Sequence, residues 1–436
     1  MGQVLIMSHS YSPIVSPRAF RWTAIAEYWA KQGDRVDIIC AWKPGLLREE
    51  VIKDVHIYRV GGAVSEMLRS RLRNSAAYPN VQDNKSTEID GLITKQTLTS
   101  FTKWVHDQTW KKVYWPDYAC LWYFPVLKKA KQLLKSCNYD AVISVSHPFT
   151  GHLVGLTLKK YYPYCKWIVD IGDPFCFLEY MPTNNQNFYK QLNYTSEKRV
   201  FRQADRITVT TKNTLTKYSE LFPNSANKIH VIPPLLSWDT SDTSQNSIFS
   251  RAEPKLRLVF VGTLHKQIRK PDLLLELFTK LLHTHLAERL ELHFVGSIDN
   301  CREYFQPYET LLNKKIFCHG KLSRYQAFQA MKEADVLVNI GNEFPYQLPS
   351  KVVEYASLGK PVLNLARIAE DSSAKFFKDY PASLCLLGNN AQVNLEQFTK
   401  LIQFLENLPS VNVSQLNSWL EPYCLEAIAE AYKRLF

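Results

Sequence analysis

The sequence predicts an α/β protein with two domains, each built around a parallel β-sheet covered by helices. Short apolar runs alternate with helical patterns along the chain, which is typical of parallel sheets buried on both faces. The length of 436 residues exceeds the size at which single cores usually stop growing. A polar stretch without apolar periodicity, residues 235–255, separates the two halves of the pattern. We therefore expect two α/β domains that face each other across a cleft.

In the first half, apolar runs of strand length are separated by stretches long enough for helices. The expected strands are 4–7, 36–40, 55–60, 141–145, 167–170, 207–209 and 229–232. The helical stretch 18–32 lies between the first two and ends before Gly33, because glycine accepts the positive φ that terminates a helix. The first domain is expected over residues 1–240.

The second half repeats this alternation, and the second domain is expected over residues 255–417. Its expected strands are 256–261, 290–295, 316–319, 336–340, 362–365 and 384–387. Helices are expected at 271–283 and 325–333, the latter opened by Ser323 and Gln326 at the spacing of a capping box. The final segment, 418–436, is expected to be a helix that crosses back and packs onto the first domain.

Composition limits the partners and the location. Lys and Arg number 53 against 41 Asp and Glu, and the net charge of +12 favours nucleotides, phosphates, nucleic acid or an acidic membrane surface. Nine scattered cysteines without a C-x-x-C pair argue against a zinc site and a disulfide framework, and they fit a reducing cytosol. Because neither a signal-peptide pattern nor a run of 18 apolar residues occurs, we expect a cytoplasmic protein.

The most informative motif lies at residues 349–362 and predicts a loop, a helix from Ser350 to Gly359 and then a strand. The free N–H groups of this helix start, at Ser350 and Lys351, suit a phosphate group. Glu354 lies about one turn further on, where its carboxylate could accept hydrogen bonds from ribose hydroxyls. The alternative is an ordinary amphipathic helix in which Lys351 and Glu354 form an i,i+3 ion pair.

Further short motifs occur in a characteristic order along the chain. They are Ser16-Pro17-Arg18, Asp170-Ile171-Gly172-Asp173-Pro174, Ala204-Asp205-Arg206-Ile207, Val231-Ile232-Pro233-Pro234, Phe260-Val261-Gly262-Thr263, Arg269-Lys270-Pro271, Phe294-Val295-Gly296, His319-Gly320 and Ala334-Asp335-Val336. With residues 349–362, they resemble the GT-B glycosyltransferases, and among these the retaining family 4 enzymes of bacterial surface-polysaccharide assembly. The resemblance extends nearly from end to end.

The resemblance implies the GT-B fold, in which two Rossmann-like domains face a central cleft and the C-terminal helix crosses back. It also implies transfer of a sugar from a UDP- or GDP-sugar to a glycan or lipid-linked acceptor, with retention of configuration. Lipopolysaccharide, capsule or O-antigen synthesis is the implied setting. The resemblance implies no cofactor and no catalytic metal, and no metal-binding D-x-D motif occurs in a suitable setting.

The donor site is implied to lie mainly in the second domain. Glu354 matches the second of two family glutamates, but the position of the first is Tyr346 here, and Glu343 lies three residues too early to replace it. Thr263 occupies the usual position of a family arginine, so Arg269 and Lys270 are expected to neutralise the leaving diphosphate in a catalytic role. The alternative is that both cations are solvated residues at a helix start. The other expected donor-binding residues are Gly262, Thr263, Gly320, Ser350 and Lys351.

In the first domain, the family's glycine-rich turn is replaced by a loop without glycine, residues 9–17. Phosphate could still meet the next helix start at Arg18, a donor-binding candidate, although a structural salt bridge is the alternative. Asp173 and His147 follow strands at the carboxyl edge of the sheet, where ligands bind, and are the catalytic candidates that would contact the acceptor. Asp173-Pro174 could instead be a simple turn.

A tryptophan-rich segment offers a surface for a lipid-linked acceptor. Trp104, Trp110, Trp115 and Trp122 alternate with lysines 103, 111, 112, 128 and 129, and arginines 69, 71 and 73 precede them. Aromatic rings with interleaved cations are typical of segments at an anionic membrane surface, so peripheral association with the inner face of the membrane is one interpretation. The alternative places these tryptophans in the core or the acceptor cleft.

Two other classes of function compete with glycosyl transfer. A basic protein that binds nucleic acid or membrane without catalysis would fit the charge, but no stacking-platform motif such as an RRM signature occurs, so we expect no nucleic-acid partner. A sugar-nucleotide epimerase of the same fold would need an acid/base set close to the sugar C2. The tryptophan-rich segment favours a large acceptor surface over such an enzyme.

Overall fold

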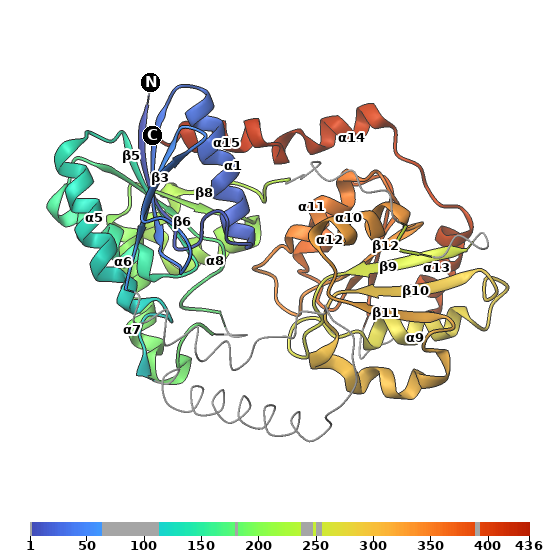
Figure 1. Cartoon of the computed structure of the whole chain (residues 1–436). Coiled ribbons are helices and arrows are strands. Elements are labelled where there is room, and N and C mark those ends of the chain that lie inside the picture. The colour runs from blue at the N-terminus through green and yellow to red at the C-terminus, as the bar shows by residue number, and fades with distance from the viewer. Residues whose placement is uncertain (1, 63–112, 179–181, 237–246, 250–254, 389–392) are drawn as a thin grey trace, which may run out of the picture. The chain divides into compact units, whose positions relative to one another are not determined.

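The computed structural model describes residues 2–62, 113–178, 182–236, 247–249, 255–388 and 393–436 (Figure 1). The chain forms two compact units that do not divide at a single point in the sequence. Unit 1 comprises Met1–Val209, Tyr218–His230 and Tyr432–Phe436, and unit 2 comprises Thr210–Lys217 and Val231–Ala431. The last residues of the chain therefore belong to the same unit as the first.

Unit 1 is built on an eight-stranded sheet in the order β3-β4-β2-β1-β5-β6-β7-β8. The strands are β1 Gln3–Met7, β2 Arg35–Ala41, β3 Glu49–Ile52, β4 Val55–Val60, β5 Ala141–Val145, β6 Lys166–Asp170, β7 Arg206–Val209 and β8 Ile229–Val231. The sequence did not predict β3, an edge strand that pairs antiparallel with β4. A two-residue turn joins them, with positive φ at Lys53 and Asp54, as in a tight hairpin.

Helices lie on both faces of this sheet (Figure 1). They are α1 Pro17–Lys31, α5 Tyr123–Ser136, α6 Thr150–Tyr161 and α7 Gln186–Gln203, with short 3₁₀ segments at Cys120–Trp122 and Pro223–Lys228. Helix α8 Lys212–Leu221 is divided between the two units. α1 begins where the Ser16 hydroxyl accepts a hydrogen bond from the Ala19 N–H. Residues of α5 and α6, including Val126 and Val154, pack with Leu5 of β1 in one core cluster.

Unit 2 is built on a six-stranded parallel sheet in the order β11-β10-β9-β12-β13-β14. The strands are β9 Leu256–Val261, β10 Leu290–Val295, β11 Ile316–Gly320, β12 Val336–Ile340, β13 Val362–Ala366 and β14 Ser383–Leu387. The helices are α9 Asp272–Leu281, α10 Arg324–Glu333, α11 Ser350–Ser357, α12 Ser372–Phe377 and α13 Leu395–Glu406, with a 3₁₀ segment at Asp299–Leu311. The predicted capping box at Ser323 and Gln326 is confirmed.

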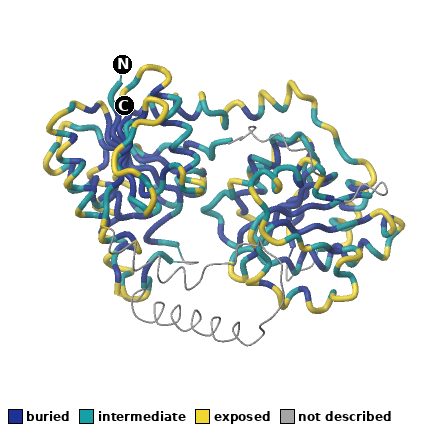
Figure 2. The backbone as a smooth tube through the Cα atoms, viewed as in Figure 1, coloured by how far each residue is buried: buried dark blue, intermediate teal, exposed yellow. Residues whose placement is uncertain are grey.

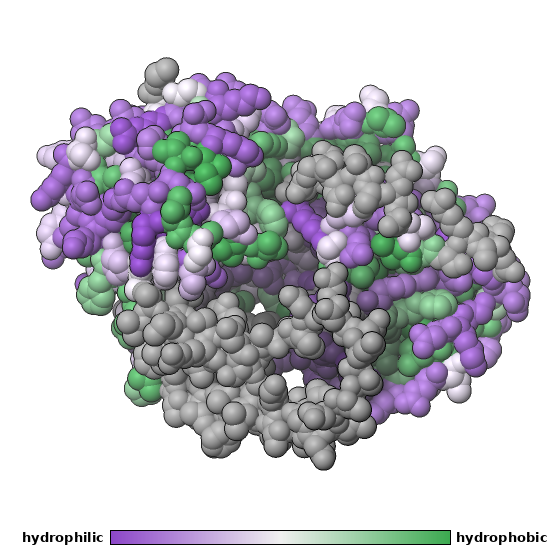
Figure 3. Space-filling model, in the orientation of Figure 1, coloured by the Kyte–Doolittle hydropathy of each residue, from purple (hydrophilic) through white to green (hydrophobic). Residues whose placement is uncertain are grey.

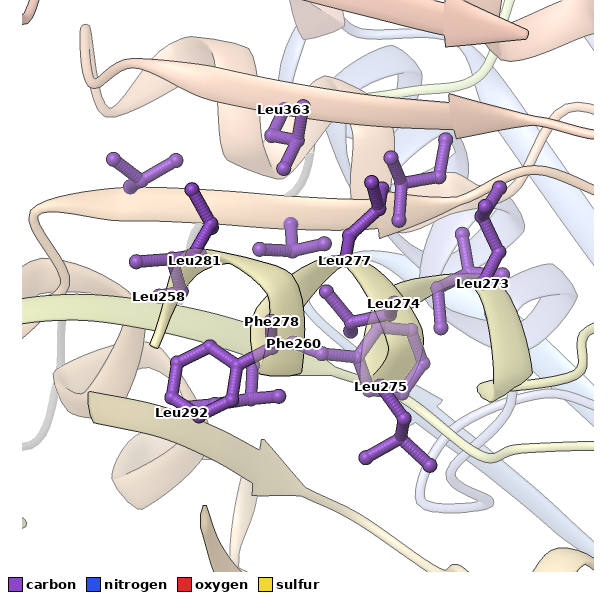
Figure 4. Packing of buried hydrophobic residues seen from close by; sticks show 14 of the residues in the cluster. Leu258, Phe260, Leu273, Leu274, Leu275, Leu277, Phe278, Leu281, Leu292 and Leu363 are labelled. Carbon is purple, nitrogen blue, oxygen red and sulfur yellow. The ribbon is translucent and has the colours of Figure 1, made fainter. Parts of the chain in front are cut away.

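Alternation along β9 explains why helices cover both faces of this sheet. Leu258 and Phe260 point to one face, where they meet the leucines of α9 (Figure 4). Val259 and Val261 point to the other face, where they share a cluster with Tyr355 of α11. Because side chains alternate along a strand, the apolar residues of this one strand supply both cores. Figure 2 shows the strands as the buried centre of each unit.

Two expectations about the chain's ends and middle are wrong. Residues 418–436 do not form one helix: α14 Val413–Leu420 is followed by a 3₁₀ turn at Glu421–Tyr423 and then α15 Leu425–Lys433. Pro422 explains the break, since it lacks an N–H and its ring would clash with the preceding helical turn.

Residues 247–249 are not part of a free linker, because Phe249 is buried in unit 2 and Glu333 accepts hydrogen bonds from the N–H groups of Ile248 and Phe249. Residues 237–246 and 250–254 of that predicted linker lie outside the described residues.

On the face shown in Figure 3, hydrophilic residues cover most of the described surface of each unit, with smaller apolar areas between them. Within the described ranges, no helix combines the length and the apolar character needed to cross a membrane.

Candidate functional site

The strand orders place a topological switch point in each sheet. In unit 2 the chain starts at the central strand β9, continues to β10 on one side and later to β12 on the other. In unit 1 the central strand β1 lies in the same way between β2 and β5. Ligands of open parallel sheets bind at the carboxyl ends of the strands beside such points. The loops after these strands are therefore the candidate sites.

In unit 2, the end of β9 separates from β12 while it remains paired with β10. The register with β12 ends at Phe260 and Val338, whereas that with β10 continues to Val261 and Val295. The following residue, Gly262, donates its N–H to the Val295 carbonyl at 2.9 Å. A Cβ at Gly296 would lie 2.0 Å from the Gly262 carbonyl oxygen, so only glycine fits there.

Arg269 lies beside this strand end. Its Nη1 is 3.6 Å from the position that a Cβ on Gly262 would take, and its Nη2 donates to Asn342 Oδ1 at 3.0 Å. Burial lowers the pKa of the Arg269 guanidinium, while Tyr355 and Asp371 act in the opposite direction. Its buried Nε has no hydrogen-bond partner among the described residues. An arginine stays protonated even when it is buried. This loop therefore holds a cation with an N–H group that could still donate a hydrogen bond.

Lys270 is engaged by a carboxylate. Its Nζ lies 2.9 Å from Glu343 Oε1, and the Glu343 N–H donates to the Ile268 carbonyl at 3.1 Å. Glu343 therefore ties the loop after β12 to the loop after β9. Both predicted cations lie in one loop, but Arg269 is held by a neutral amide and Lys270 by a charged partner.

Helix α11 begins at Ser350 and is followed by Gly359 with a φ of 65°, which confirms the predicted helix. Lys351 Nζ pairs with the Glu354 carboxylate, so the i,i+3 ion pair of the alternative interpretation does form. The structure places Thr263 in the exposed part of the loop after β9 and Gly320 at the exposed end of β11. The Gly320 carbonyl accepts the N–H of Gly296 at 2.7 Å, which links the ends of β10 and β11.

In unit 1, Arg18 serves a buried carboxylate. Arg18 Nη1 lies 3.1 Å from Asp170 Oδ2, at the end of β6. Asp170 also accepts hydrogen bonds from Trp22, Thr208 and Tyr432. Burial raises the pKa of Asp170, but Arg18, Arg21 and these hydrogen bonds outweigh it and hold the pKa below its usual value. The structural salt bridge, the alternative for Arg18, is thus present.

His147 and Asp173 come together at the carboxyl edge of the same sheet. His147 Nε2 lies 3.7 Å from Asp173 Oδ2, and their side chains are 21% and 30% exposed. The buried Nδ1 of His147 has no hydrogen-bond partner among the described residues. The two candidates chosen from different strand ends therefore form one partly open pair.

One of the four tryptophans proposed for a membrane surface is internal, and a second is half-buried. Trp122 is 5% exposed and belongs to the core cluster with Leu5, so for Trp122 the interfacial interpretation is wrong. Trp115 is half-buried, and its Nε1 donates to Asn193 Oδ1 at 3.0 Å. Trp104 and Trp110 lie outside the described residues, as do lysines 103, 111 and 112 and arginines 69, 71 and 73.

Sequence reasoning missed the residues that hold the candidates in place. Asn342 and Asp170 are polar residues at or just after the carboxyl ends of strands, and this position was a usable signal. Tyr355 was noticed only as part of a motif. Within the described part of the chain, no group of three or more His, Cys, Asp and Glu residues could hold a metal ion, and the absence of a catalytic metal stays a prediction.

The chain matches two families in sequence. Residues 98–236 match the family described as Glycosyltransferase Family 4, and residues 255–374 match Glycosyl transferases group 1. No curated protein matches the sequence.

Solved structures are similar over nearly the whole chain. Sucrose-phosphate synthase from Thermosynechococcus elongatus has a TM-score of 0.66 at 13% identity, covering 100% of this chain and 98% of its own. S. aureus TarM, in complex with fondaparinux, α-GlcNAc-glycerol and UDP, has 0.58 at 10%, covering 100% and 99%. Anabaena HepE, in complex with UDP-glucose, has 0.54 at 10%, covering 99% and 98%. The chain is thus a glycosyltransferase of the GT-B fold, with two parallel-dominated sheets, that resembles glycosyltransferase family 4.

Proposed function

We propose that this glycosyltransferase moves a sugar from a UDP- or GDP-sugar to a glycan or lipid-linked acceptor in surface-polysaccharide synthesis, with retention of configuration. The observation that carries the proposal is the buried guanidinium of Arg269, whose Nε lacks a partner among the described residues of unit 2. Departure of a nucleoside diphosphate builds negative charge, and a fixed cation in a poorly solvated site stabilises it strongly.

The other predicted donor residues have complementary roles in this proposal. The first N–H groups of α11, at Ser350 and Lys351, would bind phosphate. The Glu354 carboxylate would accept hydrogen bonds from ribose hydroxyls once its ion pair with Lys351 opens. Gly262, Thr263 and Gly320 would line the approach at the strand ends. The solved structures of HepE with UDP-glucose and of TarM with UDP support a uridine nucleotide as the first candidate.

The acceptor would meet the pair formed by His147 and Asp173 in unit 1. At 3.7 Å, the two side chains could share a hydrogen bond with an acceptor hydroxyl. For a retaining reaction, the leaving phosphate itself would take the acceptor proton, so this pair would orient the hydroxyl rather than act as the base. Asp173→Asn and His147→Ala should then lower the transfer rate while UDP affinity stays close to the wild-type value.

A lipid-linked acceptor would bring the enzyme to the inner face of the membrane. With Trp122 internal and Trp115 half-buried, this part of the proposal rests on the composition around Trp104 and Trp110. Binding to vesicles of anionic and zwitterionic lipid, compared between wild type and Trp104→Ala/Trp110→Ala, tests it. Equal binding by both proteins would remove the support that Trp104 and Trp110 give to a lipid-linked acceptor.

Calorimetry with nucleotides tests the donor assignment directly. We expect UDP or GDP to bind more tightly than the matching monophosphate, because the second phosphate would reach the loop that carries Arg269. The base that gives the tighter complex identifies the donor class, and its sugar nucleotides follow in a thermal-shift series. Absence of binding by every nucleotide would contradict the proposal and favour a basic surface protein without catalysis.

A further inference from the structure

Tyr355 joins the two elements of unit 2 that carry the donor-site candidates. Its hydroxyl accepts a hydrogen bond from the Val261 N–H at 2.7 Å and lies 3.1 Å from the Val261 carbonyl oxygen, to which it donates. Tyr355 belongs to α11, one residue after Glu354, and Val261 is the last residue of β9. One oxygen atom therefore connects α11 to the strand that leads into Gly262.

The strand pairing explains why this place needs a side chain. In a parallel sheet, the N–H and C=O of one residue point to the same neighbouring strand, and those of the next residue point to the other neighbour. Gly262 donates to Val295 of β10, so the polar groups of Val261 face β12. The register with β12 has already ended at Phe260. The Tyr355 hydroxyl takes the place of the missing strand and satisfies both groups.

The hydroxyl is well suited to this task. Tyr355 is 1% exposed, and burial raises the pKa of its hydroxyl, so the proton needed for donation to the carbonyl stays in place. The Arg269 guanidinium lies beside Gly262, the residue that directly follows Val261. The distance between the helix start and the cationic loop is thus set at the switch point, where the sheet opens.

We propose that Tyr355 is a positioning residue for sugar transfer, which holds the loop of Gly262 and Arg269 at the correct distance from the start of α11. The inference rests on the proposed function and adds a residue to it. Without the hydroxyl, α11 would still bind the diphosphate in the ground state, but Arg269 would no longer be held where charge develops. Loss of the hydroxyl would therefore reduce the stabilisation of the transition state more than the stabilisation of the bound donor.

Tyr355→Phe removes the hydroxyl alone, and Tyr380→Phe is a matched control. Tyr380 is 2% exposed, belongs to the same core cluster and donates to the Lys360 carbonyl at 2.9 Å. The readouts are the melting temperature, the Kd for UDP and the rate of UDP release from UDP-glucose, or from GDP-mannose with GDP if the guanine nucleotide binds better.

We expect both variants to fold, with a larger loss of melting temperature in Tyr355→Phe, because two buried backbone groups lose their partner there and only one does in Tyr380→Phe. In Tyr355→Phe, kcat should fall by about 10- to 100-fold, as for a small misplacement of a catalytic group, while the Kd for UDP stays near that of wild type. Tyr380→Phe should keep the wild-type kcat. This separation of kcat from Kd is what a purely structural role would not produce.

Three results would overturn the inference: an unchanged kcat in Tyr355→Phe, equal losses of kcat in both variants, or a Tyr355→Phe chain that does not fold. The last would assign the hydroxyl to stability. Failure of the proposed function looks different, because wild type would then neither bind a nucleotide nor release one from a donor. In that case the proposed role of Tyr355 in sugar transfer would be rejected together with the proposed function.

Discussion

Each of the two units places an arginine against a glycine at the carboxyl edge of its sheet, but the two arginines have different partners. Arg18 packs against Gly172, where a Cβ would lie 1.8 Å from its Nη2, and its charge is balanced by the buried carboxylate of Asp170. Arg269 lies against Gly262 and is held by the neutral amide of Asn342. Position alone therefore does not identify an anion site.

The partner decides what each cation can do for a ligand. A guanidinium paired with a buried carboxylate is part of a satisfied network, and removing either member leaves an uncompensated charge. The Arg269 guanidinium is hydrogen-bonded to an amide and interacts electrostatically with the buried Asp371, but its Nε–H has no partner among the described residues and could donate to a bound anion. The comparison predicts a stabilising role for Arg18 and a catalytic role for Arg269, and the predictions below test that division.

The largest effect is expected for Arg269→Ala. Loss of a fixed cation at the leaving diphosphate should lower kcat by roughly 10²- to 10³-fold, measured as UDP release from a UDP-sugar. Stability should change little, because removing a buried cation also removes its desolvation cost. Arg302→Ala is the control, since the side chain of Arg302 is 74% exposed. Wild-type turnover in Arg269→Ala would end its assignment as the leaving-group cation.

Arg18→Ala should act on stability instead. Removal of the cation beside the buried Asp170 should lower the free energy of unfolding by about 3 kcal/mol, measured by urea denaturation. The Kd for UDP should remain close to the wild-type value. If UDP affinity falls while stability is unchanged, Arg18 contacts the donor phosphate, as the sequence predicted. The stabilising role given to Arg18 by the comparison would then be wrong.

The pH dependence of the stability loss in Arg18→Ala is a smaller effect, but it is more specific for the ion pair with Asp170. The folded-state pKa of Asp170 is held below its ordinary value of 3.8, so its contribution to stability is complete above that value and is lost as the pH falls through the folded pKa. The stability gap between wild type and Arg18→Ala should therefore narrow on acidification below about pH 4. A gap independent of pH would mean that Arg18 stabilises the fold by packing rather than by charge.

The alternation of apolar runs predicted most of the fold. The strands 141–145, 256–261, 290–295 and 336–340 have the predicted limits, because buried parallel strands are rich in apolar residues. The edge strand β3 was missed because Glu49–Ile52 is mostly exposed and has no such run. The break at Pro422 was overlooked although proline in a helix interior is a local signal.

The candidate site was harder to predict than the fold. The role of each arginine depends on the residue that binds its guanidinium, and that residue is distant in sequence. Arg18 and Asp170 are 152 residues apart, and Arg269 and Asn342 are 73 apart. Charge and position at a helix start or strand end could select these arginines as candidates. Which of them is neutralised depends on the strand order, which brings the end of β6 to α1.

The smallest effect is expected for the ion pair of Lys351 and Glu354, whose side chains are 30% and 14% exposed. In a double-mutant cycle without nucleotide, the coupling energy should be only about 0.2–0.5 kcal/mol, because i,i+3 ion pairs on helices contribute little. If Glu354 also accepts ribose hydroxyls, Glu354→Ala should weaken UDP binding by about tenfold, the cost of a hydrogen bond to a charged group. Lys351→Ala should then free the carboxylate for the ribose, so it should weaken binding less. Equal losses of affinity would mean that the pair acts as a unit in holding α11, and that the donor site depends on Arg269 without a ribose contact from Glu354.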